Sequence, residues 1–151
     1  MQDLRIDLNE ESGEPHFEND TMVAVKSNNL KHNTLIGSYV IIPKSEVSSP
    51  FDLSDKEWAD SKDLMLKVKE YIDKKYKPDG YNIGWNVGEV AGQHVAHAHL
   101  HIIPRYSDEL YAGKGLRHLF KQPENIRKHT MVLFYCKTNS ITKKRCQKMV
   151  Y

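Results

Sequence analysis

The sequence predicts an α+β fold, in which an antiparallel sheet of about five strands is covered on one side by one long helix. Three observations predict it. Residues 54–76 carry a helix start signal and one apolar stripe, short runs before and after them carry strand patterns, and a turn signal separates the helix from the next strand.

The strands before the helix are runs of apolar, largely β-branched residues. Residues 22–25 and 35–42 fit strands, and the second run stops at Pro43, which cannot donate to a ladder. Both runs therefore belong to the predicted sheet.

The helix begins with a capping box. The Ser54 hydroxyl can accept from the backbone three residues on, and Glu57 can reach back to the Ser54 backbone. We expect this helix to extend to about Tyr76. Its apolar stripe predicts core positions, and its polar side predicts solvent contact: the stripe is Trp58, Met65, Val68 and Ile72, and the polar side includes Lys62, Lys69 and Asp73.

A turn signal follows the helix at residues 77–80, which read Lys-Pro-Asp-Gly. Residues 81–87 then fit a strand, which leads through a glycine-containing loop to an alternating run over residues 95–103. Residues 130–136 fit a last strand. Five strands with one helix between the second and the third give the predicted layer of helix on sheet.

Composition limits the number of domains and the location that we expect for the protein. The 151 residues carry a formal net charge of +2, and we expect one domain over residues 1–151, with a polar N-terminal segment and a basic C-terminal tail. No apolar run approaches the roughly 18 residues of a membrane span, and the polar, acidic start lacks a secretory signal pattern. Cys136 and Cys146 indicate neither a disulfide framework nor a zinc site. These features predict a cytoplasmic protein.

The most informative run holds His97, His99 and His101 at alternate positions. On a strand they share one face, while Ala96, Ala98, Leu100 and Ile102 share the other and suit a core. Residues two apart lie roughly 6.5 to 7 Å from each other, so three rings on a straight strand cannot reach one ion. Separate roles for the three imidazoles follow.

His99, in the middle, can attack through one ring nitrogen if a backbone carbonyl or another acceptor holds the proton on the other. Its neighbours can hold or protonate an oxyanion. This division of roles suits phosphoryl or nucleotidyl transfer, in which the protein positions an in-line attack and stabilises charge on the equatorial oxygens.

The residues around this run extend the pattern. Asn86 and the segment Gly92-Gln93-His94-Val95 precede the histidines, and Pro104-Arg105 follows them; residues 35–44 end in Ile-Pro-Lys. From about Asn19 to Arg105 the chain resembles the histidine-triad (HIT) nucleotide hydrolases and transferases. That resemblance implies the same order of strands and helix.

The resemblance also implies site roles. His99 would be the nucleophile, which attacks the α-phosphorus of a nucleotide to give a nucleotidyl-histidine that water hydrolyses. His101 would contact the α-phosphate oxygens, and His97 would orient the site from its buried end. Phosphate and leaving-group contacts would come from Gln93, the backbone of Gly92 to Val95, and Asn86, while Asn28 or Asn29 would bind the ribose.

Three positions depart from the family pattern. Ser38 stands where many members have a histidine, and no N-terminal Cys-x-x-Cys for a structural zinc is present. His94 stands where serine or threonine is common. Its ring could assist the leaving group or point to solvent.

Several alternatives stay open. The segment of residues 106–128 is basic, so Lys114 or Arg117 could attract a polyphosphate, or could be a solvated surface. The strand at residues 81–86 and Pro104-Arg105 resemble the diadenosine-polyphosphate hydrolases, which implies a dinucleoside polyphosphate as substrate, whereas Asn86 resembles the phosphoramidase branch. A metalloenzyme using His97 and His99, or His99 and His101, lacks a third ligand in the strand, and a nucleotide-binding protein without turnover is a third class.

The resemblance implies no metal or cofactor of the protein's own, although Mg²⁺ can accompany a polyphosphate substrate. It implies a homodimer formed through residues 81–87 and the long helix. We expect a nucleotide as the partner molecule, and neither a membrane nor a nucleic acid.

Overall fold

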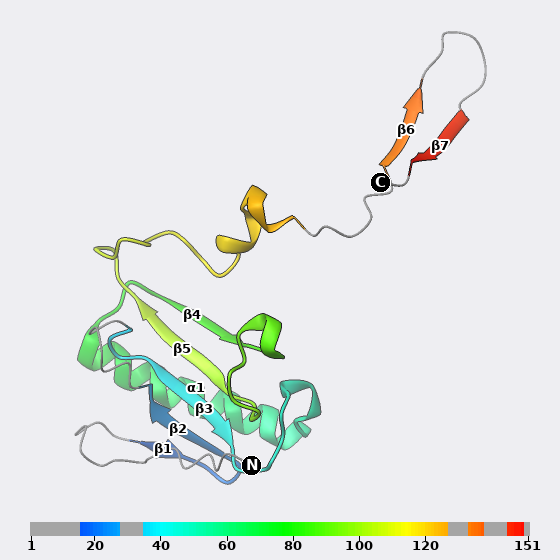
Figure 1. Ribbon diagram of the computed structural model, residues 1–151. Coiled ribbons are helices and arrows are strands. Elements are labelled where there is room, and N and C mark those ends of the chain that lie inside the picture. Colours follow the sequence, from blue (N-terminus) through cyan, green and yellow to red (C-terminus); the bar gives the residue numbers. More distant parts are fainter. Residues whose placement is uncertain (1–15, 28–34, 127–132, 138–144, 150–151) are drawn as a thin grey trace. The chain divides into compact units, whose positions relative to one another are not determined.

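The computed structural model describes residues 16–27, 35–126, 133–137 and 145–149, and its contacts divide the chain into two compact units, residues 1–113 and 114–151 (Figure 1). The first unit contains a five-stranded sheet and one α-helix. Its elements are β1 (Phe17–Glu18), β2 (Met22–Lys26), β3 (Tyr39–Pro43), η2 (Pro50–Asp52), α1 (Asp55–Tyr76), β4 (Gly80–Trp85), η3 (Glu89–Ala91) and β5 (Leu100–Arg105). The predicted α+β class is confirmed.

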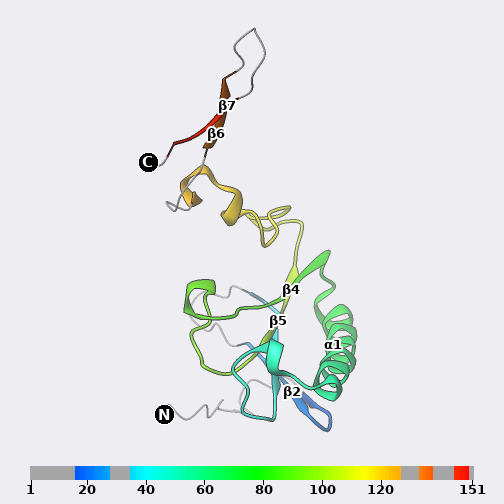
Figure 2. The same cartoon turned by 90° about the vertical axis from the view of Figure 1, so that its right-hand side faces the viewer.

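Every pairing in this sheet is antiparallel, and the strand order is β1-β2-β3-β5-β4. The last strand in sequence, β5, therefore lies between β3 and β4. Figure 2 shows α1 on one side of the sheet and the segment around η3 on the other. The sheet face opposite α1, where the η3 segment lies, is therefore available for a site.

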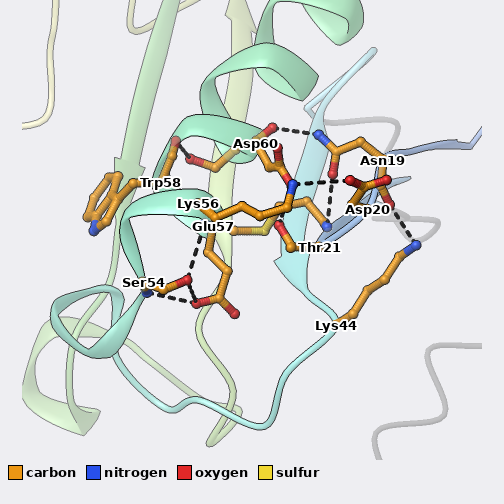
Figure 3. Close-up of polar contacts among 11 residues, drawn as sticks. Asn19, Asp20, Thr21, Lys44, Ser54, Lys56, Glu57, Trp58 and Asp60 are labelled. Atoms are coloured by element: carbon orange, nitrogen blue, oxygen red, sulfur yellow. Dashed lines mark hydrogen bonds and ion pairs between the residues drawn. The ribbon is translucent and has the colours of Figure 1, made fainter.

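Helix α1 begins and ends where the local signals predict. The Glu57 amide donates to Ser54 Oγ at 3.3 Å, and the Ser54 amide donates to Glu57 Oε2 at 2.7 Å, which completes the capping box (Figure 3). Lys77 then adopts a left-handed backbone with φ of 50°, and Pro78 follows.

A polar cluster fastens the β1–β2 turn to the first turns of α1. Thr21 Oγ1 donates to Asp60 Oδ2 at 2.7 Å, Asn19 Nδ2 donates to the Asp60 carbonyl at 2.8 Å, and Lys56 forms ion pairs with Asp20 and Asp60 (Figure 3). These contacts join segments about forty residues apart in sequence, as their 39- and 41-residue separations show.

The core lies between the sheet and α1. Fully or almost fully buried side chains from both layers form it: Met22, Ala24, Tyr39, Ile41, Leu53, Leu64, Val68, Ile72, Leu100 and Ile102. Burying each large aliphatic side chain contributes about 1.5–3 kcal/mol. Of the predicted stripe, Val68 and Ile72 are buried and Met65 is partly buried. Trp58 is 44% exposed and packs edge-on against Trp85 at 5.9 Å, so its predicted core position is wrong.

Strand β3 is shorter than the predicted run of residues 35–42. Leu35 and Gly37 have φ of 58° and 77°, so residues 35–37 form a turn and the strand begins at Tyr39. A Cβ at Gly37 would lie 2.9 Å from Tyr76 Cδ2, which leaves room only for glycine. Because Gly37 has no Cβ, the turn can pack against Tyr76 at the end of α1.

The fifth strand of the sheet is β1, which the sequence did not indicate. The predicted strand at residues 130–136 corresponds in part to β6 (Leu133–Lys137), which pairs with β7 (Arg145–Met149) in a separate two-stranded sheet. Cys136 and Cys146 are register partners there. This second unit also contains η4 (Leu119–Lys121) and η5 (Pro123–Asn125). One domain over residues 1–151 stays a prediction.

Candidate active site

The three histidines lie at the start of β5 and just before it. His101 is in the strand, whereas His97 and His99 precede it, so the predicted start at residue 95 is wrong. The alternation itself is confirmed from His97 onward: the three histidines are half-buried, and Ala98, Leu100 and Ile102 are buried. Ala96 is exposed, contrary to its predicted core position, because the chain there forms a bend and not a strand.

The ring of His99 is fixed by a backbone carbonyl. Its Nδ1 lies 2.9 Å from the carbonyl oxygen of His97, and because a carbonyl only accepts, Nδ1 carries the hydrogen. In the neutral ring Nε2 then has a free lone pair, and it makes no hydrogen bond with a described residue. This is the condition that the sequence argument set for attack by His99.

His97 holds that carbonyl in place. Its Nε2 donates to the Pro43 carbonyl, the last of β3, at 2.9 Å, and the neighbouring Ala98 amide donates to the Val47 carbonyl at 2.8 Å. Two carbonyls of residues 43–48 therefore hold the histidine segment, one through the His97 ring and the other through the Ala98 amide. His97 is half-buried, and the orienting role that we expected for it stays a prediction.

Gln93 is buried and links three loops. Its Oε1 accepts from the Gly88 amide at 2.7 Å, and its Nε2 donates to the Ser48 carbonyl at 2.8 Å and more weakly to the His97 carbonyl at 3.5 Å. Both ends of the amide are thus engaged within the protein. A direct contact of Gln93 with phosphate or the leaving group stays a prediction and would require an exchange of these partners.

The other predicted phosphate contacts surround this loop. Gly92 has φ of 88°, and a Cβ there would lie 3.7 Å from Asn86 Nδ2, so Asn86 and Gly92 are close. His94 is exposed and Val95 is 38% exposed. Asn28 and Asn29, the predicted ribose ligands, lie outside the described residues.

His101 faces the same side of the sheet. Its register partners are Val40 on β3 and Gly84 on β4, and its ring packs edge-on against the His99 ring at 4.8 Å. Burial, with a smaller effect of the nearby His99, holds the pKa of His101 below its usual value near 6.5. The neutral ring is therefore favoured.

Sequence reasoning missed the supports of this site. Ser45 Oγ donates to Glu57 Oε1 in a short hydrogen bond, so the capping carboxylate of α1 also fastens the loop that supplies the Pro43, Val47 and Ser48 carbonyls. Main-chain carbonyls leave no residue-type signal. The capping box did identify Glu57, but nothing in the sequence points to Ser45 as its partner.

The remaining candidates are Lys114 and Arg117, which lie in the second unit, and a metal. A phosphate role for either cation stays a prediction. Within the described residues, no group of three or more histidine, cysteine, aspartate or glutamate side chains is placed to hold a metal ion. In the same part of the chain, no helix is long and apolar enough to cross a membrane.

Fold and site together define an α+β protein that presents histidine rings on the sheet face opposite its helix. The chain belongs to the HIT domain family, whose model matches residues 14–108. That range contains the five-stranded sheet, α1 and all three histidines.

Curated relatives share about half of the chain. The sequence is 36% identical over 91 residues to "Adenosine 5'-monophosphoramidase hnt1" of Schizosaccharomyces pombe, covering 60% of this chain and 65% of that protein. It is 39% identical over 71 residues to "Bis(5'-nucleosyl)-tetraphosphatase [asymmetrical]" of the same organism, covering 47% of this chain and 39% of that protein. The chain thus spans less than two thirds of the length of either relative.

Solved structures agree on the fold. A HIT family protein from Bacillus anthracis superposes with a TM-score of 0.57 at 28% identity, covering 70% of this chain and 76% of that chain. A HIT family member from Bacillus subtilis superposes with a TM-score of 0.54 at 27% identity, covering 65% and 70%. Both matches support the arrangement of helix and sheet described above.

Proposed function

We propose that this chain is a nucleotide hydrolase or transferase that attacks the α-phosphate of a dinucleoside polyphosphate through His99. The observation that carries the proposal is the 2.9 Å hydrogen bond from His99 Nδ1 to the His97 carbonyl, which leaves the Nε2 lone pair available. The names of two relatives, a tetraphosphatase and a phosphoramidase, support the substrate class.

In the first step, Nε2 of His99 forms a bond to the α-phosphorus while the bond from phosphorus to the bridging oxygen breaks. The nucleoside polyphosphate leaves and takes up a proton. In the second step, water attacks the same phosphorus, the P–N bond breaks, and a nucleoside monophosphate and the free ring are restored. No redox change occurs, and the protein needs no metal of its own for either step, although Mg²⁺ can accompany the polyphosphate.

The neighbouring groups have supporting roles in this proposal. His101, neutral at physiological pH, contacts a non-bridging oxygen of the α-phosphate, and His97 orients His99 through its carbonyl. Gln93, Asn86, His94 and the backbone of Gly92 to Val95 form the rim where the leaving group departs, and Asn29 contributes a ribose contact.

The covalent intermediate provides the test. A substrate labelled at the α-phosphate, mixed with the full chain and quenched in base, should yield protein that carries one nucleotidyl group on the His99 peptide by mass spectrometry. His99→Ala should lose both the adduct and turnover while nucleotide binding survives. His118→Ala, which removes an exposed histidine to which the proposal gives no role, is the matched control and should form the adduct.

The runner-up substrate is a nucleoside phosphoramidate. Asn86, close to Gly92, and the 36% identity to a protein named as a monophosphoramidase favour it. Values of kcat/KM for a panel of dinucleoside polyphosphates and nucleoside phosphoramidates decide between the two. Equal turnover by wild type and His99→Ala would instead identify a nucleotide-binding protein without this chemistry, and metal bound stoichiometrically to the purified chain would favour the His-x-His metalloenzyme.

We also propose a cytoplasmic homodimer. Strand β4 is an edge of the sheet, and Ile83 on it is 42% exposed, so a second copy has an unpaired strand to join. Sedimentation of the full chain tests the dimer.

A further inference from the structure

Two buried polar atoms lack a hydrogen-bond partner among the described residues, namely Ser38 Oγ and His101 Nε2. Ser38 is 1% exposed, so its hydroxyl cannot turn to bulk water. The other ring nitrogen of His101, Nδ1, is not enclosed in this way. Buried polar groups without partners are costly and rare in native proteins, so each of these two needs an explanation.

The sheet register brings the two residues together. Val40 is the register partner of His101, and Ser38 lies two residues before Val40, so Ser38 is on the same face. Diagonal neighbours of this kind have Cα atoms about 7–8 Å apart, which long side chains bridge. The ladder continues through Ser38, whose carbonyl accepts from the Ser27 amide at 2.9 Å, so its backbone is held in this position.

Other polar side chains on this face are less suited to pair with Nε2. Gly84, the partner of His101 on β4, has no side chain. Asn82, diagonal to His101 on β4, accepts from the Arg105 guanidinium through its Oδ1, and its Nδ2 makes no hydrogen bond with His101 Nε2. Asn86 lies beside Gly92, and His99 is committed to the His97 carbonyl through Nδ1.

We propose that Ser38 is a positioning residue that sets the tautomer of His101. Through one bridging water, the Ser38 hydroxyl keeps a hydrogen-bond donor at His101 Nε2, so the ring carries its own hydrogen on Nδ1. A polar site with two partners of this kind is suited to an ordered water.

The consequence for catalysis rests on the proposed function. His99 binds a carbonyl through Nδ1–H and offers a lone pair on Nε2, whereas His101 receives a hydrogen bond at Nε2 and offers Nδ1–H. Two adjacent rings then present complementary groups, a nucleophile and a donor for a non-bridging oxygen of the α-phosphate.

The test is the ring tautomer, read by ¹⁵N NMR on the full chain labelled in histidine, at a pH where the rings are neutral. In the wild type, His101 should show a protonated Nδ1 and an unprotonated Nε2. Ser38→Ala should shift His101 toward the Nε2–H form, which a free histidine side chain favours. Ser38→Thr, which keeps the hydroxyl, should retain the wild-type tautomer.

Ser61→Ala is the matched control, because Ser61 is also a buried serine, but on α1, where its hydroxyl donates to the Trp58 carbonyl at 2.8 Å. It should leave the His101 signal unchanged. If Ser38→Ala fails to fold, Ser38→Cys, a weaker donor of similar volume, takes its place. A wild-type His101 in the Nε2–H form, or a tautomer that is the same in all Ser38 variants, overturns the proposal.

Kinetics separate this inference from the proposed function. Ser38→Ala should lower kcat by about tenfold with little change in KM, less than the 10²–10³-fold that removal of a direct oxyanion donor costs. A tautomer shift in a chain with no nucleotidyl transfer leaves the Ser38 proposal standing and refutes the function. Full turnover by a Ser38→Ala protein whose His101 tautomer has not shifted refutes the Ser38 proposal and leaves the proposed function standing.

Discussion

His99 Nδ1 donates to the carbonyl oxygen of His97 at 2.9 Å, and the His97 ring in turn donates to the carbonyl of Pro43 at 2.9 Å. The direction of the free lone pair on His99 therefore depends on a residue that itself depends on the end of β3. Two hydrogen bonds in series connect the His99 ring to the sheet.

His97→Ala should lower kcat by about 10²-fold, because loss of the ring releases the carbonyl that orients His99, and small misplacements of reacting groups are costly. The KM should change less, since His97 contacts no substrate in the proposed mechanism. Steady-state kinetics with a dinucleoside polyphosphate measure this, with His118→Ala as the exposed control. An unchanged kcat would show that His99 keeps its orientation without the Pro43 hydrogen bond.

Gln93→Ala should destabilise the protein by about 1–3 kcal/mol, because it leaves the Gly88 amide and the Ser48 carbonyl without their partner. Urea unfolding measures the free energy. Gln122→Ala is the control: Gln122 also donates its amide to a backbone carbonyl, that of His118 at 2.9 Å, but is exposed and should change little. Equal effects of the two substitutions would contradict a linking role for Gln93.

Glu57 predicts a pH-dependent stability. Hydrogen bonds from Ser45 and Ser54 hold the pKa of its carboxyl below the usual value near 4.5. The stabilisation is therefore fully present above about pH 4.5, and it is lost as pH falls through the lower folded pKa.

Glu57→Gln should accordingly be less stable than the wild type near pH 7, by about 1 kcal/mol, because glutamine keeps one acceptor oxygen but loses the charge and the second acceptor of the carboxylate. The difference should shrink as the pH falls below the folded pKa. Urea unfolding of both proteins across the acid range gives the two curves. A difference that stays constant with pH would mean that the charge of Glu57 contributes nothing.

The lowered pKa of His101 predicts a second pH range, above that of Glu57, in which the stability of the protein changes. Burial lowers the pKa of the folded ring, so between that pKa and about 6.5 the unfolded chain binds a proton that the folded chain does not. The free energy of unfolding should fall as pH drops through this window and then level off. His101→Asn should remove this slope, and an NMR titration of the wild-type ring should give a midpoint below 6.5. A midpoint at or above that value would contradict the prediction.

Gly37→Ala should be strongly destabilising. The left-handed backbone alone costs about 1–2 kcal/mol for a residue with a Cβ, and contact with the Tyr76 ring adds about 1–3 kcal/mol of overpacking. Gly113→Ala is the control, because its φ is 75° but its Cβ would meet nothing within 4 Å. The difference between the two in thermal unfolding isolates the contact, and no difference would mean that the Tyr76 ring moves aside freely.

The parts of the fold with local signals were predicted well. The bounds of α1 follow from the capping box at Ser54 and the Lys77-Pro78 stop, all of which are encoded within a few residues. The alternation at His97 to Ile102 likewise follows from local periodicity. The family resemblance added the residues of the site, although their roles stay predictions.

Features that depend on distant contacts were missed or misplaced. His97 and His99 have strand-like spacing but lie before β5, because residues 43–48 bind the His97 ring and the Ala98 amide between them. β1 has two residues, too few for a periodic pattern, and is defined only by its pairing with β2. The inward use of the Gln93 amide could not be predicted, because its partners are a backbone amide and two carbonyls.

The anchors of the histidine segment are the carbonyls of Pro43 and Val47, and the Ser48 carbonyl anchors Gln93 beside it. Any residue supplies a carbonyl oxygen, so apart from Ser45, which donates to Glu57, this loop can accept replacements of exposed side chains such as Glu46 without moving the rings. Tolerance to substitution in the loop and geometric accuracy at His99 are thus compatible, since one depends on side chains and the other on the path of the backbone.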